Sequence, residues 1–332
     1  MGMLIDGKWQ SEDVFPSNDR GDFVRRETTF RNWVTRDGAP GPVGTGGFRA
    51  EPGRYHLYVS LACPWAHRTL IFRALKRLED AIAVSIVDPF MGDHGWAFSA
   101  PDGSLTPGST PDQLNGSRYL ADIYLKADPQ FTGRVTVPIL WDKRTAAIVN
   151  NESSEIIRML NSAFDDFADA RLDFYPPALR VAIDEINPVT YANVNNGVYR
   201  CGFARTQSAY EAAFAVLFRT IDDLEARLSR NRYLTGDRIS EADWRLFPTL
   251  VRFDSVYYSH FKCNLRRLID YPNLGGYTRE LYQWPGVAAT VNLAQIKRHY
   301  YASHASINPT RIVPLGPALD FTTPHGRDRR YV

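Results

Sequence analysis

The stretch YHLYVSLACPWAHRTLIF, residues 55–72, changes its hydrophobic period at a single cysteine, and this change strongly constrains the fold. Before Cys63 the chain alternates as a β-strand does, and after it apolar residues recur at helical spacing. Pro64 suits the first position of a helix, where its missing N–H would have no partner in any case. The pattern therefore predicts a strand that ends near Cys63 and a helix over residues 64–78.

This junction would place the thiol of Cys63 at the positive end of a helix. Unpaired backbone N–H groups at such an end stabilise a thiolate and lower the pKa of the thiol. His67 and Arg68, one turn further on, add positive potential. The alternative is a buried structural cysteine, the commonest role of a free cysteine. The strand–Cys–Pro–helix context favours the reactive interpretation, so Cys63 is the candidate nucleophile.

Residue 66 is alanine, so Cys63 has no partner in a Cys-x-x-Cys pair. A thiolate that attacks a sulfur substrate forms a mixed disulfide, which another thiol must resolve. Cys201 and Cys263 are distant in sequence, although the fold could bring either of them close. The simpler inference is an external small thiol as cosubstrate.

The first half of the chain alternates strands with helices after a Gly/Pro-rich arm. Residues 81–88 form a buried strand of the parallel type, which completes a strand–helix–strand unit. A long polar loop at 89–117 has the length and composition of a functional segment. The other elements expected in this half are a helix at 119–129, strands at 134–142 and 146–151, and a helix at 152–164.

The second half is expected to be helical. One face of a long helix at 206–230 is apolar. Ser240 and Asp243 have the spacing of a capping box, and Ile239 and Trp244 that of a hydrophobic staple. The predicted organisation is an arm (1–53), an α/β domain (54–165), a linker (166–189), a helical domain (190–312) and a tail (313–332).

Composition excludes several classes of function. The net charge of +2 gives no electrostatic reason to expect a nucleic-acid or membrane partner. No apolar run is long enough to cross a bilayer, and the first residues do not have the pattern of a signal peptide. Three widely separated cysteines suit neither a disulfide framework nor a metal site, and they indicate a reducing cytoplasm.

Two further segments could bind a ligand. Pro138 interrupts the strand VTVPIL, which suits an edge strand or a cis bond that exposes the backbone of Val137 to an extended peptide ligand. Glu152 and Ser153 open a helix, where a hydroxyl and backbone N–H groups can hold a carboxylate and Glu152 can accept from an ammonium. Ordinary capping is the alternative for both residues.

These segments resemble a known family. CPWAHR, TVPIL and NES, in their predicted elements, resemble the thioredoxin-like domain of the cysteine-type glutathione transferases. The motifs SLACPWAHRTL, GDHGWAFS, NNGVYRCGFA, RFDSVYYSHFKCN and IKRHYYASHASINP are similar to those of the glutathionyl-hydroquinone reductases, the xi class. The resemblance covers nearly the whole chain. It implies an α/β thioredoxin-like N-terminal domain followed by an all-α glutathione-transferase C-terminal domain.

The resemblance also implies roles for residues that match its motifs. Cys63 is then the nucleophile and Tyr199 the proton donor and acceptor, while Tyr257 and Tyr300 hydrogen-bond at the site and depress the pKa of the thiol. The residues expected to bind glutathione are Trp96, Arg134, Val135, Thr136, Val137, Glu152 and Ser153. Further candidates are Tyr191, Tyr258, Tyr301 and His304. For any single tyrosine the alternative is a core aromatic residue with a bonded hydroxyl.

The implied activity is the reduction of glutathionyl-hydroquinones to hydroquinones, with glutathione as cosubstrate and no metal. Cys63 would take the glutathionyl group as a mixed disulfide, and a second glutathione would release glutathione disulfide. The resemblance further suggests a homodimer. Two alternatives remain open: an omega-like thiol transferase or dehydroascorbate reductase, and a non-catalytic glutathione-binding module.

Overall fold

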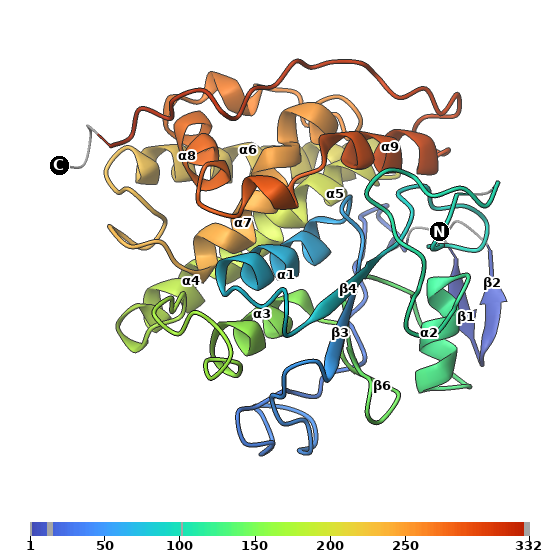
Figure 1. Ribbon diagram of the computed structural model, residues 1–332. Coiled ribbons are helices and arrows are strands. Elements are labelled where there is room, and N and C mark those ends of the chain that lie inside the picture. Colours follow the sequence, from blue (N-terminus) through green and yellow to red (C-terminus); the bar gives the residue numbers. More distant parts are fainter. Residues whose placement is uncertain (1, 12–15, 101, 329–332) are drawn as a thin grey trace. The chain divides into compact units, whose positions relative to one another are not determined.

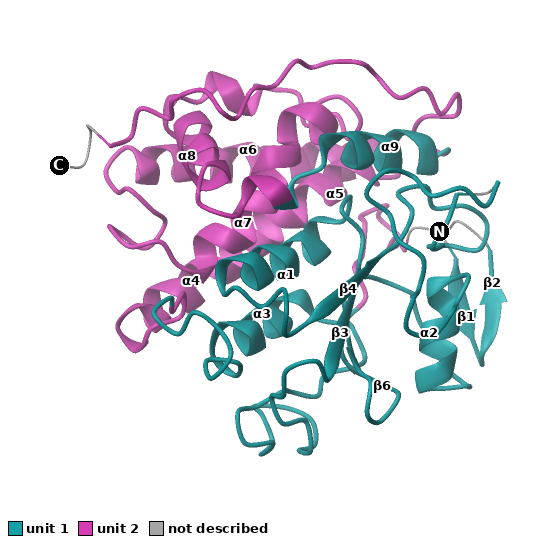
Figure 2. Cartoon of the chain, in the orientation of Figure 1, with its two compact units in different colours: residues 1–14, 27–172, 290–305 teal, residues 15–26, 173–289, 306–332 magenta. Residues whose placement is uncertain are grey.

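The computed structural model describes residues 2–11, 16–100 and 102–328, and these form two compact units (Figures 1 and 2). Unit 1 comprises residues 1–14, 27–172 and 290–305, and unit 2 comprises residues 15–26, 173–289 and 306–332. The structure does not describe a few residues of the predicted arm, loop and tail, which are residues 1, 12–15, 101 and 329–332.

A four-stranded mixed sheet is the centre of unit 1. Its strands are β3 (Tyr55–Val59), β4 (Ala83–Ile86), β5 (Ile139–Asp142) and β6 (Ala147–Asn150), in the order β4-β3-β5-β6. β3 pairs parallel with β4, as predicted, and β5 pairs with β6 as the predicted hairpin. β3 also pairs antiparallel with β5, which the sequence did not indicate. All five residues of β3 are buried, so both faces of this strand belong to the core.

Four helices accompany the sheet in unit 1. They are α1 (Pro64–Leu75), α2 (Leu120–Ala127), α3 (Ser153–Ser162) and α9 (Leu293–Ser303). α1 packs against α3, and in Figure 1 both lie on the side of the sheet opposite α2. α1 ends three residues earlier than predicted, because Arg77 adopts a left-handed backbone conformation (φ 54°) directly after the C-cap Lys76. The apolar run therefore continues past the end of the helix.

The N-terminal arm contains more regular structure than its composition indicates. β1 (Met3–Ile5) and β2 (Lys8–Gln10) form a two-stranded antiparallel sheet. Leu4 exchanges two 2.9 Å backbone hydrogen bonds with Gly133, and Arg31 forms an antiparallel bridge with Asn150 at the edge of β6. Backbone pairing of this kind depends little on side chains, which is why Gly/Pro content alone did not indicate it.

The strand predicted at 134–142 begins only at Ile139. The backbone of Gly133 pairs with Leu4, and the backbone of Thr136 bonds to the side chain of Tyr124. Pro138, which has no N–H, comes directly before the strand, and the Val137–Pro138 bond is cis. Residues 134–138 are therefore not part of the ladder of the central sheet.

Unit 2 is helical. Its α-helices are α4 (Arg180–Thr190), α5 (Gly197–Gly202), α6 (Gln207–Leu228), α7 (Glu241–Arg252) and α8 (Pro272–Tyr282). Two π-helical segments, Tyr191–Asn195 and Phe253–Tyr257, continue α4 and α7. The described residues also include short 3-10 turns at Pro177–Leu179, Leu268–Asp270 and Ala288–Thr290.

Local sequence signals explain where the helices of unit 2 begin. Thr206 caps α6, its hydroxyl accepting from the N–H of Ala209 at 3.2 Å. The capping box predicted at the start of α7 is present: the Asp243 carboxylate accepts from the N–H of Ser240 at 2.8 Å. The same carboxylate also accepts from the hydroxyl of Tyr277 at 2.6 Å, which links α7 to α8.

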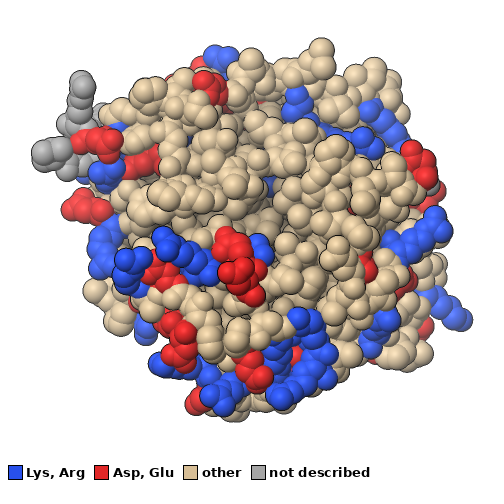
Figure 3. All heavy atoms as spheres, in the orientation of Figure 1, with Lys and Arg blue, Asp and Glu red and all other residues tan. Residues whose placement is uncertain are grey.

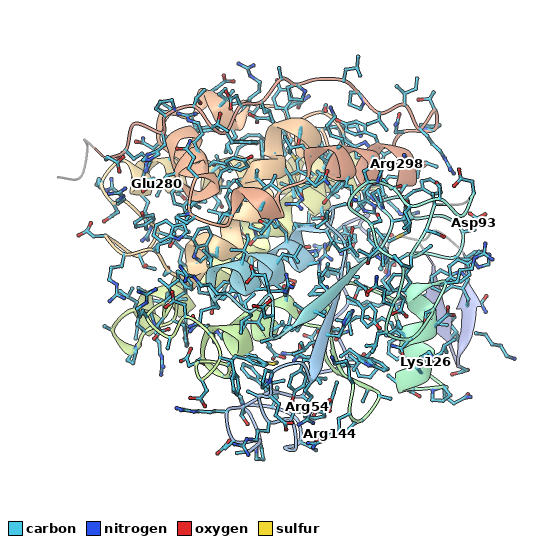
Figure 4. All side chains as sticks on the ribbon, in the orientation of Figure 1. Arg54, Asp93, Lys126, Arg144, Glu280 and Arg298 are labelled. Atoms are coloured by element: carbon cyan, nitrogen blue, oxygen red, sulfur yellow. The ribbon has the colours of Figure 1, made fainter. Side chains whose placement is uncertain are left out.

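A buried ion pair holds one end of the sheet. Arg54 donates to both oxygens of Asp142, at 2.9 and 2.7 Å, and a further bond from Arg54 reaches Glu51 at 3.0 Å. Figure 4 labels Arg54 and Arg144, which lie beside each other at this end; Arg144 also donates to Glu51. Burial alone would raise the pKa of Asp142, but hydrogen bonds from Arg54, Arg144 and Thr145 outweigh it and lower this pKa below its usual 3.8.

We expect Asp142→Asn to destabilise the protein by about 3 kcal/mol at pH 7, because Arg54 is left buried without its counter-charge. A carboxyl whose pKa is lowered in the folded state stabilises it above the unfolded pKa and loses this effect as pH falls through the folded value. The stability gap between variant and wild type should therefore narrow below about pH 4. Urea unfolding at a series of pH values measures it.

Glu51→Gln is the matched control, because its carboxylate contacts the same guanidinium from a side chain that is 36% exposed. We expect Glu51→Gln to lower the free energy of unfolding by less than about 1 kcal/mol. If the difference in unfolding free energy between the wild type and Asp142→Asn stays constant from pH 7 to pH 3, the ionised carboxylate of Asp142 is not the stabilising group.

Candidate active site

Cys63 is the N-cap of α1, as predicted. Its backbone is extended (φ −75°, ψ 123°), Pro64 is the first helical residue, and the first turn contains no Asp or Glu. The thiol is 9% exposed and donates to the carbonyl oxygen of Val137 at 3.5 Å. The fold thus brings the sulfur to the cis-proline segment, 74 residues away in sequence, and to a helix end that favours negative charge.

Tyr124 holds the cis-proline segment in place. Its hydroxyl donates to the carbonyl oxygen of Thr136 at 2.9 Å and accepts from the N–H of Thr136 at 3.2 Å. The amide of Asn151 donates to the same hydroxyl at 3.2 Å. Burial raises the pKa of Tyr124, so the phenol stays protonated at neutral pH and can serve as both donor and acceptor. Val135 and Val137 on either side are buried, and Arg134 is half-buried.

Glu152 is the N-cap of α3 and Ser153 is its first residue. The Glu152 carboxylate accepts from the N–H and the hydroxyl of Ser154, at 3.0 and 2.9 Å, which is the capping role foreseen as the alternative. The hydroxyl of Ser153 accepts from Arg68 at 3.3 Å. Arg68, proposed above only as a source of positive potential, is 1% exposed and connects α1 to α3.

Trp96 belongs to the long loop between β4 and α2, and this loop is well bonded. The N–H of Asp88 donates to the carbonyl of Ala97 at 2.7 Å, while the Asp88 carboxylate accepts from the N–H of Phe90 at 2.8 Å. Trp96 is 5% exposed, and its ring stacks on the imidazole of His299 with centroids 4.7 Å apart. The loop therefore presents Trp96 from a fixed backbone.

Tyr300 is part of unit 1, although it lies more than 200 residues after Cys63. It is on α9 and is 1% exposed. Its ring makes edge contacts with His299 and His304 at 5.2 and 5.4 Å. Tyr301 is also buried on α9, and His304 is its C-cap. Of the predicted residues, unit 1 contains Cys63, Trp96, Arg134, Val135, Thr136, Val137, Glu152, Ser153 and Tyr300.

Tyr199 and Tyr257 belong to an aromatic cluster of unit 2. Their ring centroids are 6.0 Å apart, and Tyr257 stacks on Phe261 at 5.5 Å. The guanidinium of Arg25 lies over the ring of Tyr199 at 4.8 Å, and Arg25 donates to Asn196 at 2.8 Å. This residue of the arm is a neighbour of Tyr199 that the sequence did not indicate.

One π-helical segment, Phe253–Tyr257, lies within the tyrosine motif at 252–264, and the other, Tyr191–Asn195, ends where the motif at 195–204 begins. Tyr257 ends one segment and Tyr258 follows it, while Tyr191 begins the other and is 36% exposed. Single π turns occur often at functional sites, because the extra residue rotates the following side chains relative to an α-helix. This feature distinguishes the two motifs from ordinary core helix, and no periodicity in the sequence signals it.

The other two cysteines also belong to unit 2. Cys201 and Cys263 are free and buried. Burial, together with the neighbouring Cys201, raises the pKa of the Cys263 thiol, which makes it a poor nucleophile. Cys63 is therefore the single cysteine of unit 1.

Charged side chains of both signs are interspersed on the face shown in Figure 3. Within residues 2–11, 16–100 and 102–328, no group of three or more His, Cys, Asp or Glu side chains is arranged to hold a metal ion. The helices of this part of the chain include none long and apolar enough to cross a membrane.

Comparisons with known proteins identify the family of the chain. The family of glutathione S-transferase N-terminal domains matches residues 62–163, and that of the C-terminal domains matches residues 207–280. The chain is 55% identical to glutathionyl-hydroquinone reductase YqjG of Escherichia coli, over 100% of both chains. The predicted fold class, a thioredoxin-like domain followed by a helical glutathione-transferase domain, is confirmed.

Two solved structures are also similar. The glutathione-bound structure of YqjG from Escherichia coli K-12 has a TM-score of 0.91 and 54% identity, covering 99% of this chain and 100% of that one. The Xi glutathione S-transferase of Phanerochaete chrysosporium has a TM-score of 0.87 and 52% identity, covering 93% of this chain and 96% of that one.

We expect Tyr124→Phe to weaken the binding of glutathione and to lower the free energy of unfolding by about 1–2 kcal/mol. The variant leaves the backbone of Thr136 and the amide of Asn151 without their shared hydroxyl, so the segment that faces Cys63 loses its support. Isothermal titration calorimetry and thermal unfolding measure the two effects.

Tyr55→Phe is the matched control. The hydroxyl of Tyr55 donates to the carbonyl of Arg49 at 2.7 Å, so this variant also loses a partly buried hydrogen bond of a tyrosine in unit 1. A similar loss of stability with unchanged glutathione affinity is expected. Equal changes in affinity for both variants would show that Tyr124 has no specific role at the site.

Proposed function

Because the chain belongs to the xi-class glutathione transferases, the family of the glutathionyl-hydroquinone reductases, we propose that it reduces glutathionyl-hydroquinones to hydroquinones with glutathione. The observation that carries the proposal is the environment of Cys63. It is the single cysteine of unit 1, it caps a helix without acidic residues in its first turn, and it lies 3.5 Å from the carbonyl of Val137.

We assign glutathione to the surface that these elements form in unit 1. The backbone of Val137 would pair with the extended tripeptide, flanked by Arg134, Val135 and Thr136. Trp96 would pack on the ligand. The γ-glutamyl end would meet Glu152 and Ser153, where the N–H groups at the start of α3 favour a carboxylate.

The first chemical step frees the hydroquinone. Protonation of the ring carbon that carries sulfur converts the hydroquinone into a keto tautomer with a tetrahedral carbon, and we assign Tyr199 as the proton donor. The Cys63 thiolate attacks the glutathione sulfur. The carbon–sulfur bond then breaks, and its electron pair returns to the ring. We assign Tyr257 and Tyr300 as hydrogen-bond donors at this site.

The second step regenerates the thiolate. A second glutathione attacks the Cys63–glutathione mixed disulfide at the glutathione sulfur and leaves as glutathione disulfide. In the sum, one glutathionyl-hydroquinone and one glutathione give one hydroquinone and one glutathione disulfide. The ring is reduced by two electrons, and the two sulfurs supply them. Alanine at position 66 fits this scheme, because a resolving cysteine there would compete with the external thiol.

The wild-type protein, given a glutathionyl-hydroquinone and glutathione, is expected to form hydroquinone and glutathione disulfide in equal amounts. Cys63→Ser should reduce turnover by more than about a thousandfold, because an alkoxide cannot replace the thiolate near neutral pH. Chromatography of both products measures this, and intact-mass analysis should detect one glutathionyl adduct on the wild-type protein alone.

Cys201→Ser is the matched control, since it removes a buried thiol of unit 2 and should leave turnover unchanged. Full activity of Cys63→Ser would exclude the proposed nucleophile. Faster turnover of dehydroascorbate or of simple mixed disulfides than of glutathionyl-hydroquinones would instead support the omega-like alternative.

Alkylation separates an active thiol from an inert one. We expect the rate of Cys63 modification by iodoacetamide to reach half its plateau well below pH 8.5, because the helix N-terminus stabilises the thiolate. Peptide mass mapping assigns the rate to Cys63. Cys263 is the internal comparison, and its raised pKa should keep it unmodified in the folded protein. A half-plateau near pH 8.5 for Cys63 would support the non-catalytic module.

We also propose a cytoplasmic location and a homodimer. Three free cysteines suit a reducing compartment, where glutathione is kept as the thiol. The proposal of a dimer rests on family membership, and light scattering tests it.

We also propose a division of the chain into five parts. They are an arm at 1–53, a glutathione-binding domain at 54–165, a linker at 166–189, a helical domain at 190–312 and a tail at 313–332.

A further inference from the structure

We propose that Gln295, His299 and Ser303, a polar row on α9, position Trp96 and so help to determine the affinity for glutathione. This inference rests on the proposed function, because it takes Trp96 as part of the glutathione site. The row would act through the loop that carries Trp96 and would not contact the ligand itself.

The three residues are spaced four apart, which places them on one face of the helix. Each one bonds to the loop between β4 and α2. The side-chain amide of Gln295 donates to the carbonyl of Pro107 at 2.9 Å, and the hydroxyl of Ser303 accepts from the N–H of Met91 at 2.9 Å. α9 therefore holds the loop near its beginning and again after Trp96.

His299, in the middle of the row, makes two contacts with the loop. Its Nδ1 lies 2.9 Å from the carbonyl oxygen of Pro89. A carbonyl only accepts, so Nδ1 carries the hydrogen and the tautomer is determined by this bond. The opposite contact is the stack on Trp96, with ring centroids 4.7 Å apart and an angle of 20° between the planes.

Both rings are nearly buried, with His299 at 7% and Trp96 at 5% exposure. The backbone of Trp96 is held separately, because its carbonyl accepts from the N–H of Leu120 at 2.9 Å. Trp96 is thus restrained twice, by the hydrogen bond to its main chain and by the stack of its indole ring on His299. A ligand that packs on a side chain already held in place loses less conformational entropy on binding, so removing the restraint should weaken binding.

The test measures glutathione binding by isothermal titration calorimetry. His299→Phe keeps an aromatic face for Trp96 and removes the bond to Pro89. His299→Asn keeps a donor near Pro89 and removes the face. We expect each variant to raise the Kd by about fivefold, the value of one hydrogen bond or one aromatic contact. Turnover at saturating glutathione should change by less than about twofold, so that the effect lies in KM.

A double-mutant cycle shows whether the row acts through Trp96. Trp96→Ala should itself weaken binding, and His299→Phe in that background should have no further effect on Kd. Arg298→Gln is the matched control, because Arg298 neighbours His299 on α9, is exposed and is labelled in Figure 4. We expect Arg298→Gln to bind as the wild type does.

Three results would overturn the inference. The first is that both His299 variants bind glutathione with the Kd of the wild type. The second is that His299→Phe raises the Kd as much in the Trp96→Ala background as it does in the wild-type protein. If the His299 variants do not fold, Ser303→Ala takes their place in the same cycle, and the same two criteria apply. The third is an unchanged Kd for Trp96→Ala, which would also remove Trp96 from the proposed glutathione site. Loss of hydroquinone formation with glutathione binding intact would affect the proposed function alone.

Discussion

The junction between β3 and α1 is the constraint on which the rest of unit 1 depends. A buried strand ends one turn before a helix that begins with proline, and Cys63 occupies the cap between them. A cap residue has non-helical backbone angles, so its side chain lies beside N–H groups that no carbonyl of the helix can satisfy. The position of the sulfur is therefore determined by the backbone at this junction.

Hydrogen bonds from distant parts of the chain shape the surroundings of that sulfur. The hydroxyl of Tyr124 supports Thr136, one residue before the carbonyl that faces Cys63. Arg68, on the same helix as the thiol cap, bonds to Ser153 at the start of α3. These bonds tie the cis-proline segment to α2 and tie α1 to the start of α3.

Much of this arrangement follows from local patterns in the sequence. The change of period at Cys63 and the spacing of Ser240 and Asp243 each depend on backbone rules that operate within a few residues. Their predicted structures are present. The partners of Tyr124 and His299 could not be foreseen, because each bond joins segments with no shared periodicity: 12 residues apart for Tyr124 and Thr136, and 210 for His299 and Pro89. The assignment of α9 to unit 1 has the same cause, since only tertiary contacts decide it.

Position 66 shows how one small side chain limits the chemistry. Ala66 is fully buried in the first turn of α1, at the place where a Cys-x-x-Cys pair would have its second sulfur. With a methyl group there, the first turn of α1 offers Cys63 no second thiol, and Cys201 and Cys263 are buried in unit 2. Under the proposed mechanism, a mixed disulfide on Cys63 would therefore be resolved by a thiol that comes from solution. In the proposed mechanism such a thiol would have to fit the surface that bound the first glutathionyl group, which would favour glutathione over other thiols for both steps.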